Sequence, residues 1–507
     1  MKAKRSIINI ISATLLQIIT AILGFIIPKI TLTNYGSEIN GFMSLVTQIY
    51  SYIALLEAGL GTTVLQALYS PIARNDYNEI SGIVNAAKKY YSKLALYYSG
   101  ADAVVTVILP IVLNTNLSKT EVVLYFLIFG ISNIVNFLFT AAYRPILTAE
   151  GKNYVNSNIS IVFHTVLQFA KILLLAIGVN IIFLQLVYSL INITQVIVYI
   201  IYFKRNYAWI DKKKPPLFSK LKQRSSFFIQ QLSNLLLSCT DIMILSLFCD
   251  LKVVSVYTVY MLVYGVIGTL SSNISSSTQF ILAQSYTENK AAYLKIHRAY
   301  EMLFICINCI LVTTADVLTI PFIKLYTAGV TDVNYIDFAF PVLLSINAIL
   351  STFKSTSLAI INFSYHAKST IFQTVSEAVL NVILTLIFVP LWGMKGALLG
   401  TSISLFYRLI SLLFYVNNRI LSDSIKQPLK LYISNFCIFI IIAYIGYKIN
   451  IQIDSYASFV INGIISVLAI SIPFVLLNAL LNLQYTKFII SFIKGKLLRK
   501  KSNIFFN

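Results

Sequence analysis

Apolar stretches of about 20 residues or more follow one another along almost the whole chain, separated by short polar connections. A helix of that length can cross the hydrocarbon core of a membrane, where a chain must satisfy its backbone hydrogen bonds internally. Charged residues make up only 11% of the chain, against about 25% in an ordinary soluble domain. The sequence therefore predicts an all-α polytopic membrane protein.

Six such stretches precede the middle of the chain and eight follow it, so we expect about fourteen transmembrane helices. The first begins directly after the basic MKAKR and lacks a small-residue cleavage pattern, which predicts a retained helix rather than a signal peptide. The expected spans are 7–32, 39–69, 90–113, 121–147, 155–178 and 181–203, and then 226–249, 254–285, 298–326, 338–363, 370–390, 396–416, 431–450 and 456–482.

The basic stretch from Lys204 to Arg224 separates these two groups and holds eight of the chain's 39 Lys and Arg residues. An even number of spans places both termini on the same side of the membrane. On that threading the even-numbered connections and the termini carry 29 basic residues, the odd-numbered connections carry four, and six lie in or near the spans. Because positive residues favour the cytoplasmic side, we expect both termini and the basic stretch in the cytoplasm.

The order of these segments predicts two six-helix bundles, at 1–203 and 226–418, joined by a cytoplasmic linker at 204–225. Residues 419–507 add two further spans and a basic tail. The stretch from Tyr35 to Ile80 resembles that from Cys249 to Ile296, since both combine a short turn, a long helix with spaced tyrosines, and a polar loop. An even number of helices per repeat predicts a pseudo-two-fold axis along the membrane normal, with a cavity between the bundles.

Ionisable side chains within the spans cost about 2.5 to 3.5 kcal/mol on insertion, so each marks a candidate functional site. Lys354 and Arg408 lie near the middle of their spans and are expected to face a lumen. Arg144 and Lys29 lie nearer the span ends, so for them the sequence leaves lumen-facing and snorkelling positions open. The other embedded base is Lys171, and the embedded acids are Glu57, Asp102, Asp241, Asp316 and Glu377.

Polar residues recur at helical spacing beside four of these charges, which indicates helix faces that point inward. For the uncharged members the simpler interpretation is hydrogen bonding between helices, and for the charged members it is a water-accessible cavity. A run of small hydroxylated residues at 271–279 is compatible with a hinge or with close packing. The stripes are Gln230, Asn234, Ser238 and Asp241; Gln373, Glu377 and Asn381; Asn347, Ser351 and Lys354; and Gln48, Tyr52 and Glu57.

Enzyme and metal signatures are absent from the sequence. It contains no Walker-type phosphate loop, no Gly-x-Ser-x-Gly elbow and no Rossmann glycine pattern, and its three histidines are far apart. We therefore expect no catalytic residues, no metal site, no cofactor and no enzyme activity, while coupling to a proton gradient, a sodium gradient or the membrane potential stays open. The net charge of +21 resides mostly in loops, which argues against a nucleic-acid partner.

Several segments together resemble the multidrug/oligosaccharidyl-lipid/polysaccharide exporter superfamily, and within it the Wzx-type repeat-unit flippases. The resemblance covers about residues 5 to 420. Its first motif is PKITLTNYGSEINGFMSLVTQIYSYIALLEAGLG, from Pro28 to Gly61, and its second is TDIMILSLFCDLKVVSVYTVYMLVYG. One departure is Ser255, where many relatives carry Gly. The remaining motif positions are Asp241, Tyr257, Asn381, Pro390, Gly393, Gly396 and Ala397.

This resemblance implies translocation of polyprenyl-pyrophosphate-linked oligosaccharides across the bacterial cytoplasmic membrane, for capsule, exopolysaccharide or O-antigen synthesis, by a rocking motion of the two bundles. It also implies contact with membrane lipids and association with a polysaccharide polymerase and other assembly proteins. A pyrophosphate in a low-dielectric cavity needs fixed cations, for which the candidates are Arg144, Lys171, Lys354 and Arg408. The candidates for ion coupling or charge balance are Glu57, Asp241 and Glu377.

Three alternatives remain at this point. A cation-coupled multidrug exporter of the same fold would favour an acidic lumen, whereas the most central charges here are basic. A flippase for a lipid-linked cell-wall precursor would use the same cationic chemistry. A membrane polysaccharide polymerase or glycosyltransferase would usually need a larger outer loop than the roughly twelve residues that the threading allows.

Overall fold

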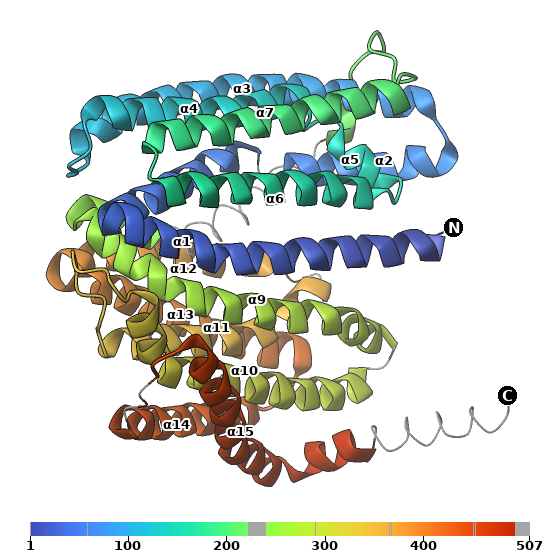
Figure 1. Ribbon diagram of the computed structural model, residues 1–507. Coiled ribbons are helices and arrows are strands. Elements are labelled where there is room, and N and C mark those ends of the chain that lie inside the picture. The colour runs from blue at the N-terminus through green and yellow to red at the C-terminus, as the bar shows by residue number, and fades with distance from the viewer. Residues whose placement is uncertain are drawn as a thin grey trace, which may run out of the picture. The chain divides into compact units, whose positions relative to one another are not determined.

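The computed structural model describes residues 2–57, 59–221, 240–288, 290–364, 366, 368–449, 451 and 453–491. Within them all regular structure is helical (Figure 1). Eleven described helices are long and apolar enough to cross a membrane, and they match eleven of the expected spans. The first two expected spans fall wholly or partly in α1 (Lys2–Ala54), while most of the span at 226–249 and of the basic tail lies outside the described residues. The predicted all-α membrane fold is confirmed.

The chain forms two compact units, called unit 1 and unit 2. Unit 1 comprises Met1–Thr258 with Gly329–Val333, and unit 2 comprises Val259–Ala328 with Asn334–Asn507. The remaining elements of unit 1 are η1 (Leu55–Glu57), α2 (Leu60–Arg74), α3 (Tyr77–Val112), α4 (Lys119–Phe139), α5 (Arg144–Ala149), α6 (Asn153–Ile177), α7 (Ile181–Asn206) and η2 (Phe218–Leu221). Helix α9 (Leu251–Glu288) begins in unit 1 and continues in unit 2, which also holds α10 (Lys290–Tyr326), α11 (Ala339–Phe363), η3 (Lys368–Thr370), α12 (Ile371–Trp392), α13 (Met394–Tyr415), η4 (Val416–Leu421), α14 (Lys426–Ile449) and α15 (Tyr456–Leu481).

In unit 1, helices α3, α4 and α7 lie side by side, and α6 joins them to α1 (Figure 1). Local sequence determines where these helices start. Ser118 and Glu121 form a capping box at the start of α4, and the Asn180 side chain accepts a hydrogen bond from the amide of Ile182 at the start of α7. Such caps satisfy amide groups that have no partner inside the helix.

Two of the expected spans in unit 1 are not continuous helices. The span at 39–69 is interrupted by η1 and the turn at Gly59, and the span at 121–147 is interrupted by a turn between α4 and α5. Proline explains the second break, because Pro145 at the start of α5 has no amide to continue the hydrogen bonding of α4. The helices after the breaks, α2 and α5, pack against each other. Each of these two expected spans is therefore built from more than one helix.

Odd-numbered connections meet at one end of unit 1. The Glu38 carboxylate accepts hydrogen bonds from the Thr115 hydroxyl at 2.7 Å and from the Asn116 amide at 2.6 Å, which joins the first connection to the third. The Tyr35 hydroxyl donates to the carbonyl of Val179 at 2.6 Å, which joins the first connection to the fifth. In unit 1 the first, third and fifth connections therefore share one end.

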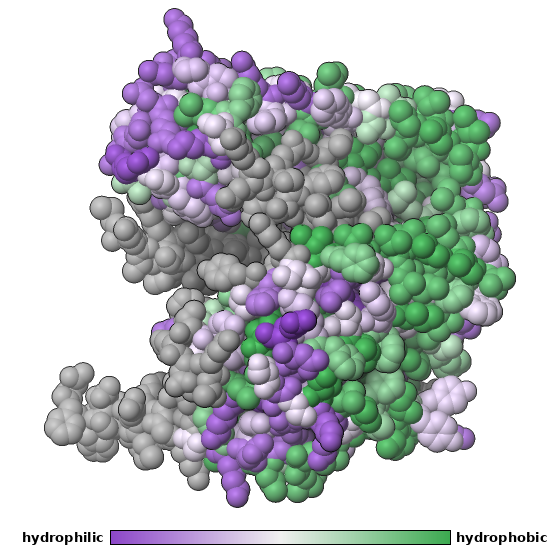
Figure 2. Space-filling model, turned by 180° about the vertical axis from the view of Figure 1, so that it is seen from behind, coloured by the Kyte–Doolittle hydropathy of each residue, from purple (hydrophilic) through white to green (hydrophobic). Residues whose placement is uncertain are grey.

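The even-numbered connections of unit 1 meet at the opposite end, where the described part of the basic stretch packs against the first turns of α3. Glu79 forms ion pairs with Arg74 at 2.9 Å and with Lys220 at 2.8 Å. The Tyr207 hydroxyl donates to the Glu150 carboxylate at 2.8 Å. Figure 2 shows hydrophilic side chains gathered at this end of unit 1 and hydrophobic side chains along the helices. That pattern suits helices surrounded by lipid and a polar end in water.

In unit 2, helix α10 packs against α11, α14 and α15, and α13 packs against both α11 and α12. The last two helices are joined by a buried amide pair, in which Asn435 and Asn478 donate to each other at 3.0 and 2.8 Å. Helices α14 and α15 are therefore integral parts of unit 2 and are not an appended tail.

Candidate functional site

A buried ion-pair cluster lies among α11, α12 and α13 of unit 2. The Lys354 ammonium is 2.7 Å from Oε1 of Glu377, and Nε of Arg408 is 3.5 Å from Oε2 of the same carboxylate. One acid thus lies between two bases that are distant in the sequence, and the group carries one net positive charge. We call these three residues the Glu377 cluster.

The polar stripe on α12 holds this cluster in place. Arg408 donates to the side-chain oxygen of Gln373 at 3.1 Å and to the hydroxyl of Thr374 at 2.7 Å. Asn381, one turn beyond Glu377, donates to the hydroxyl of Thr401 on α13 at 2.9 Å. The stripe at 373, 377 and 381 therefore faces neighbouring helices, as its helical spacing predicts.

The two bases of the cluster differ in access. Arg408 is only 1% exposed and is enclosed between α12 and α13, whereas the side chain of Lys354 keeps 13% of its surface exposed. In this conformation Lys354 is the cation of the cluster that a bound molecule could reach. Arg408 approaches the same carboxylate from α13, with its Nε 3.5 Å from Oε2 and without a hydrogen bond to it.

A cavity of about 530 Å³ opens between α9, α11 and α13 of unit 2, and we call it the hydroxyl cavity. None of its described lining residues is charged. Ser351 and Ser355 on α11 both face it, and Lys354 lies between them in sequence. The run at 271–279 contributes several of its hydroxyl groups, so these side chains border open space rather than a tightly packed helix. The polar lining consists of Tyr264, Ser271, Ser272, Ser275, Ser276, Gln279, Asn347, Ser351, Thr352, Ser355 and Thr401.

Unit 1 contains a smaller polar cavity of about 210 Å³, which we call the amide cavity. Arg144 lies in its wall, with the guanidinium carbon 4.5 Å from the ring centroid of Tyr199. Within the described part of the chain, Nε of Arg144 is buried without a hydrogen-bond partner. The other polar lining residues are Ser132, Asn133, Asn136, Tyr188, Asn192 and Gln195. A cation with a spare donor beside a polar cavity can bind an anionic group.

The remaining predicted site residues lie in unit 1. Glu57, at the first helix break, accepts a hydrogen bond from the Tyr91 hydroxyl at 2.9 Å and attracts Arg144 electrostatically. Asp241 is buried and accepts from the Tyr257 hydroxyl at 2.8 Å. Lys171 is half-buried on α6 and forms no ion pair with any described residue. The structure therefore brings Glu57 near Arg144, but it gives Lys171 no such neighbour.

Sequence reasoning missed a second buried ion-pair group in unit 2. Arg298, the first residue of the expected span at 298–326, was not among the candidate site residues and is only 3% exposed. It pairs with Glu301 at 2.8 Å and with Asp423 at 2.7 Å. The available signal was the three-residue spacing between Arg298 and Glu301, which places both side chains on one helix face. Their pairing with Asp423 could not be predicted from spacing.

The end of unit 1 at which the odd-numbered connections meet also holds a close contact, which we call the Asp332 clasp. Both the amide and the hydroxyl of Ser37 donate to the Asp332 carboxylate, at 2.9 and 2.7 Å. The Asn40 side chain donates to the Ser255 hydroxyl at 2.8 Å, so α1 is tied to the first turns of α9. A side chain at Gly41 would place Cβ only 1.9 Å from the carbonyl oxygen of Leu251, which explains the glycine there.

Solved transporter structures share this fold. The lipid II flippase MurJ in an inward closed conformation superposes with a TM-score of 0.64 at 16% identity, covering 94% of this chain and 99% of that protein. An inward-facing multidrug resistance MATE family transporter of the MOP superfamily gives 0.62 at 15% identity, covering 83% and 99%. An outward-facing MATE structure gives 0.54 at 15% identity, covering 84% of this chain and 94% of that one. No family model and no curated protein matches the sequence.

Proposed function

We propose that this protein is a flippase that moves polyprenyl-pyrophosphate-linked oligosaccharides from the inner to the outer leaflet of a bacterial cytoplasmic membrane, with both termini in the cytoplasm. Transport follows alternating access, and the glycan serves capsule, exopolysaccharide or O-antigen synthesis. A polysaccharide polymerase and other assembly proteins are its expected partners. The fold shared with flippases and exporters supports the general class, and the chemistry of the candidate site supports the substrate.

The observation that carries this proposal is the position of Lys354, which belongs to a cluster with one net positive charge, keeps part of its side chain exposed, and lies on α11, the helix that also contributes Ser351 and Ser355 to the hydroxyl cavity. A pyrophosphate needs fixed cations, while sugar hydroxyls need neutral donors and acceptors. Lys354 would bind the anionic headgroup, and the cavity's serines and amides would contact sugar. Arg144 beside the amide cavity supplies a second cationic position, and Lys171 a third. Glu377, Glu57 and Asp241 would balance charge or couple transport to an ion gradient.

The drug-exporter alternative predicts an acid that faces the substrate cavity. Among the described lining residues of the hydroxyl cavity and of the amide cavity there is no acid, and the acid nearest Lys354 is already paired with two bases. In these two cavities the observations favour an anionic substrate over a cationic drug.

A flippase for a lipid-linked cell-wall precursor is the second candidate. The similarity to the lipid II flippase covers 94% of this chain, against 83% for the inward-facing MATE transporter. A cationic headgroup site fits either lipid-linked substrate equally well. The two flippase candidates therefore differ only in the glycan that the transported lipid carries.

The test is leaflet exposure of lipid-linked oligosaccharide in right-side-out vesicles that contain the intact protein or Lys354→Ala at equal abundance. Loss of the cation should reduce transport by about tenfold or more, because a charge-assisted contact contributes about 1.5 to 3 kcal/mol. Lys354→Arg should retain most activity. The matched control is Lys324→Ala, which removes a base near the end of α10, outside the lining of either cavity.

Two results would reject the proposal. Intact protein that exports organic cations but moves no lipid-linked glycan would establish the exporter alternative. Undiminished transport by Lys354→Ala at equal abundance would show that the headgroup does not bind at Lys354. Vesicles supplied with a lipid-linked cell-wall precursor, in place of the oligosaccharide, distinguish the two flippase candidates.

A further inference from the structure

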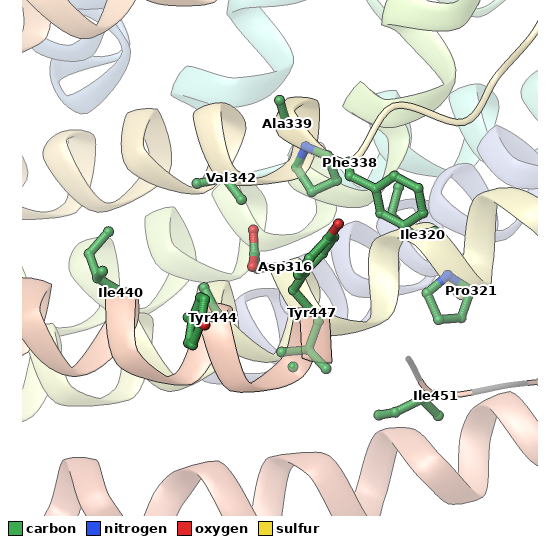
Figure 3. A pocket seen from close by; sticks show the side chains of 14 residues that line it. Asp316, Ile320, Pro321, Phe338, Ala339, Val342, Ile440, Tyr444, Tyr447 and Ile451 are labelled. Atoms are coloured by element: carbon green, nitrogen blue, oxygen red, sulfur yellow. The ribbon is translucent and has the colours of Figure 1, made fainter. Parts of the chain in front are cut away.

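A third cavity, of about 440 Å³, lies between α10, α11 and α14 of unit 2 and shares no lining residue with the hydroxyl cavity. Its wall is almost entirely apolar. Asp316 on α10 is the only charged residue among the described residues that line it. Figure 3 shows the Asp316 carboxylate between residues of α11 and residues of α14. We call this space the Asp316 cavity.

The Asp316 carboxyl group is buried and has few polar contacts. It is 7% exposed and accepts one hydrogen bond, from the hydroxyl of Ser345 at 3.1 Å. The Ser345 hydroxyl in turn lies 2.8 Å from that of Tyr264. Asp316 forms no ion pair with any described residue, and no base is among the described residues that line its cavity. A buried acid without a cationic partner is costly in a membrane.

Three aromatic residues line the same cavity, each with about half or more of its surface exposed. Phe338 precedes α11, and Tyr444 and Tyr447 lie on α14, where both are labelled beside Asp316 in Figure 3. The rings of Phe338 and Tyr447 are in contact, with centroids 5.7 Å apart. Aromatic faces attract cations, and most strongly those that water solvates poorly. An acid together with several aromatic rings in an apolar cavity is the chemistry that recognises a substituted ammonium ion.

We propose that the Asp316 cavity binds a small organic ammonium ion that carries an apolar body. The cationic nitrogen pairs with the Asp316 carboxylate, and the apolar body packs against Phe338, Tyr444 and Tyr447. Because α14 supplies two of these rings, the site requires one of the two helices that follow the second six-helix bundle. This inference goes beyond the proposed flippase function and does not depend on it.

The competing occupant is a neutral hydrocarbon chain from a lipid. Such a chain would gain from burial of apolar surface but would leave the carboxylate without a partner. Charge therefore discriminates between the occupants, so the experiment compares a cation with a neutral molecule of the same shape.

The probe is phenethyltrimethylammonium, and the comparison is its neutral isostere with carbon in place of nitrogen. Binding to the purified full-length protein is measured by equilibrium dialysis in nanodiscs of phosphatidylglycerol, a lipid without an ammonium group. We expect saturable binding of the cation and about tenfold or more weaker binding of the isostere. Asp316→Asn should weaken cation binding by a similar factor while leaving isostere binding unchanged.

Ala443→Phe keeps the acid but fills the cavity from α14, and it should abolish binding of both molecules. Its control is Ile441→Phe, which adds the same ring at an exposed position of α14 outside the lining. Equal affinity for cation and isostere would overturn the proposal and assign the cavity to a neutral chain, and so would undiminished cation binding by a folded Asp316→Asn. If Asp316→Asn fails to fold, the isostere and Ala443→Phe still decide the question.

The ammonium could come from an aminophospholipid or from a soluble amine. Adding phosphatidylethanolamine to the nanodiscs separates these sources, since a lipid amine would compete with the probe and lower its apparent affinity. Unchanged affinity would point to a soluble amine. This experiment measures probe binding and does not measure transport of lipid-linked glycan. Failure of the flippase proposal would therefore leave the binding result intact.

Discussion

At the residue scale, the main feature of unit 2 is one carboxylate shared by two bases. Glu377 is 2% exposed and Arg408 is 1% exposed, so neither charge is screened by water. A buried ion pair often adds little net stability, but removing one partner leaves an uncompensated charge. Two bases depend on Glu377, which makes it the most sensitive member of the cluster.

Glu377→Gln should therefore lower the free energy of unfolding by about 3 to 5 kcal/mol, because it leaves two buried cations without an anion. The measurement is thermal unfolding of the detergent-solubilised protein. The matched control is Lys395→Met, which breaks the more exposed ion pair between Lys395 and Asp337 and should cost about 1 kcal/mol or less. Equal, small losses in the free energy of unfolding of Glu377→Gln and Lys395→Met would show that Glu377 does not hold the two bases.

At the element scale, the Asp332 clasp ties α1 to α9 and to the connection before α11. Its hydrogen bonds join residues about 215 and 295 positions apart in the sequence. Gly36 interrupts the helix just before the clasp with φ of 82°, a backbone conformation that glycine adopts without strain. Gly41 then permits close contact between the two backbones. In an alternating-access cycle, we expect this contact to break when the protein opens on that side.

Gly41→Ala should open the clasp, because its Cβ would overlap the carbonyl of Leu251. In a background without native cysteines, Ser255→Cys reports opening by its reaction with a water-soluble thiol reagent. Ser255 is 0% exposed, so its cysteine should react slowly with Gly41 present and several-fold faster in Gly41→Ala.

Gly24→Ala is the control for this experiment, since no atom lies within 4 Å of a Cβ at that position. It should leave the reaction rate of Ser255→Cys unchanged. If Ser255→Cys reacted with the thiol reagent equally fast with Gly41 and with Gly41→Ala, the close contact at Gly41 would not be what holds the clasp shut.

At the scale of the whole molecule, the distribution of charge predicts how the protein is oriented in the membrane. The structure places odd-numbered and even-numbered connections of unit 1 at opposite ends. It does not assign either end to a side of the membrane. The side on which each end lies follows from the positive-inside rule alone.

Cysteines at Thr115 and at Lys213 should report opposite sides of the membrane in intact bacterial cells. A membrane-impermeant thiol reagent should label Thr115→Cys directly and Lys213→Cys only after permeabilisation. The reverse pattern would invert the predicted orientation, and with it the proposed direction of transport. Both substitutions lie in connections, where we expect little effect on folding.

The sequence predicts which residues of the site share a helix face, but not which residues of other helices they contact. Stripe positions such as Gln373, Glu377 and Asn381 follow directly from helical periodicity. Which helix such a stripe faces does not follow, since a helix in lipid can turn any face toward any neighbour. The pairing of Glu377 with both Lys354 and Arg408 and the burial of Arg298 were therefore not predictable from spacing.

The sequence by itself determined that this is an all-α membrane protein, because twenty-residue apolar stretches have no other stable form in lipid. It also determined the alternation of its connections, since each span reverses the side. Only the tertiary structure decided where two of those spans break, which charges pair, and which residues enclose the three cavities. Those outcomes depend on contacts between helices that are distant in the sequence, such as α10 with α14, and a pattern within one helix does not specify its partners.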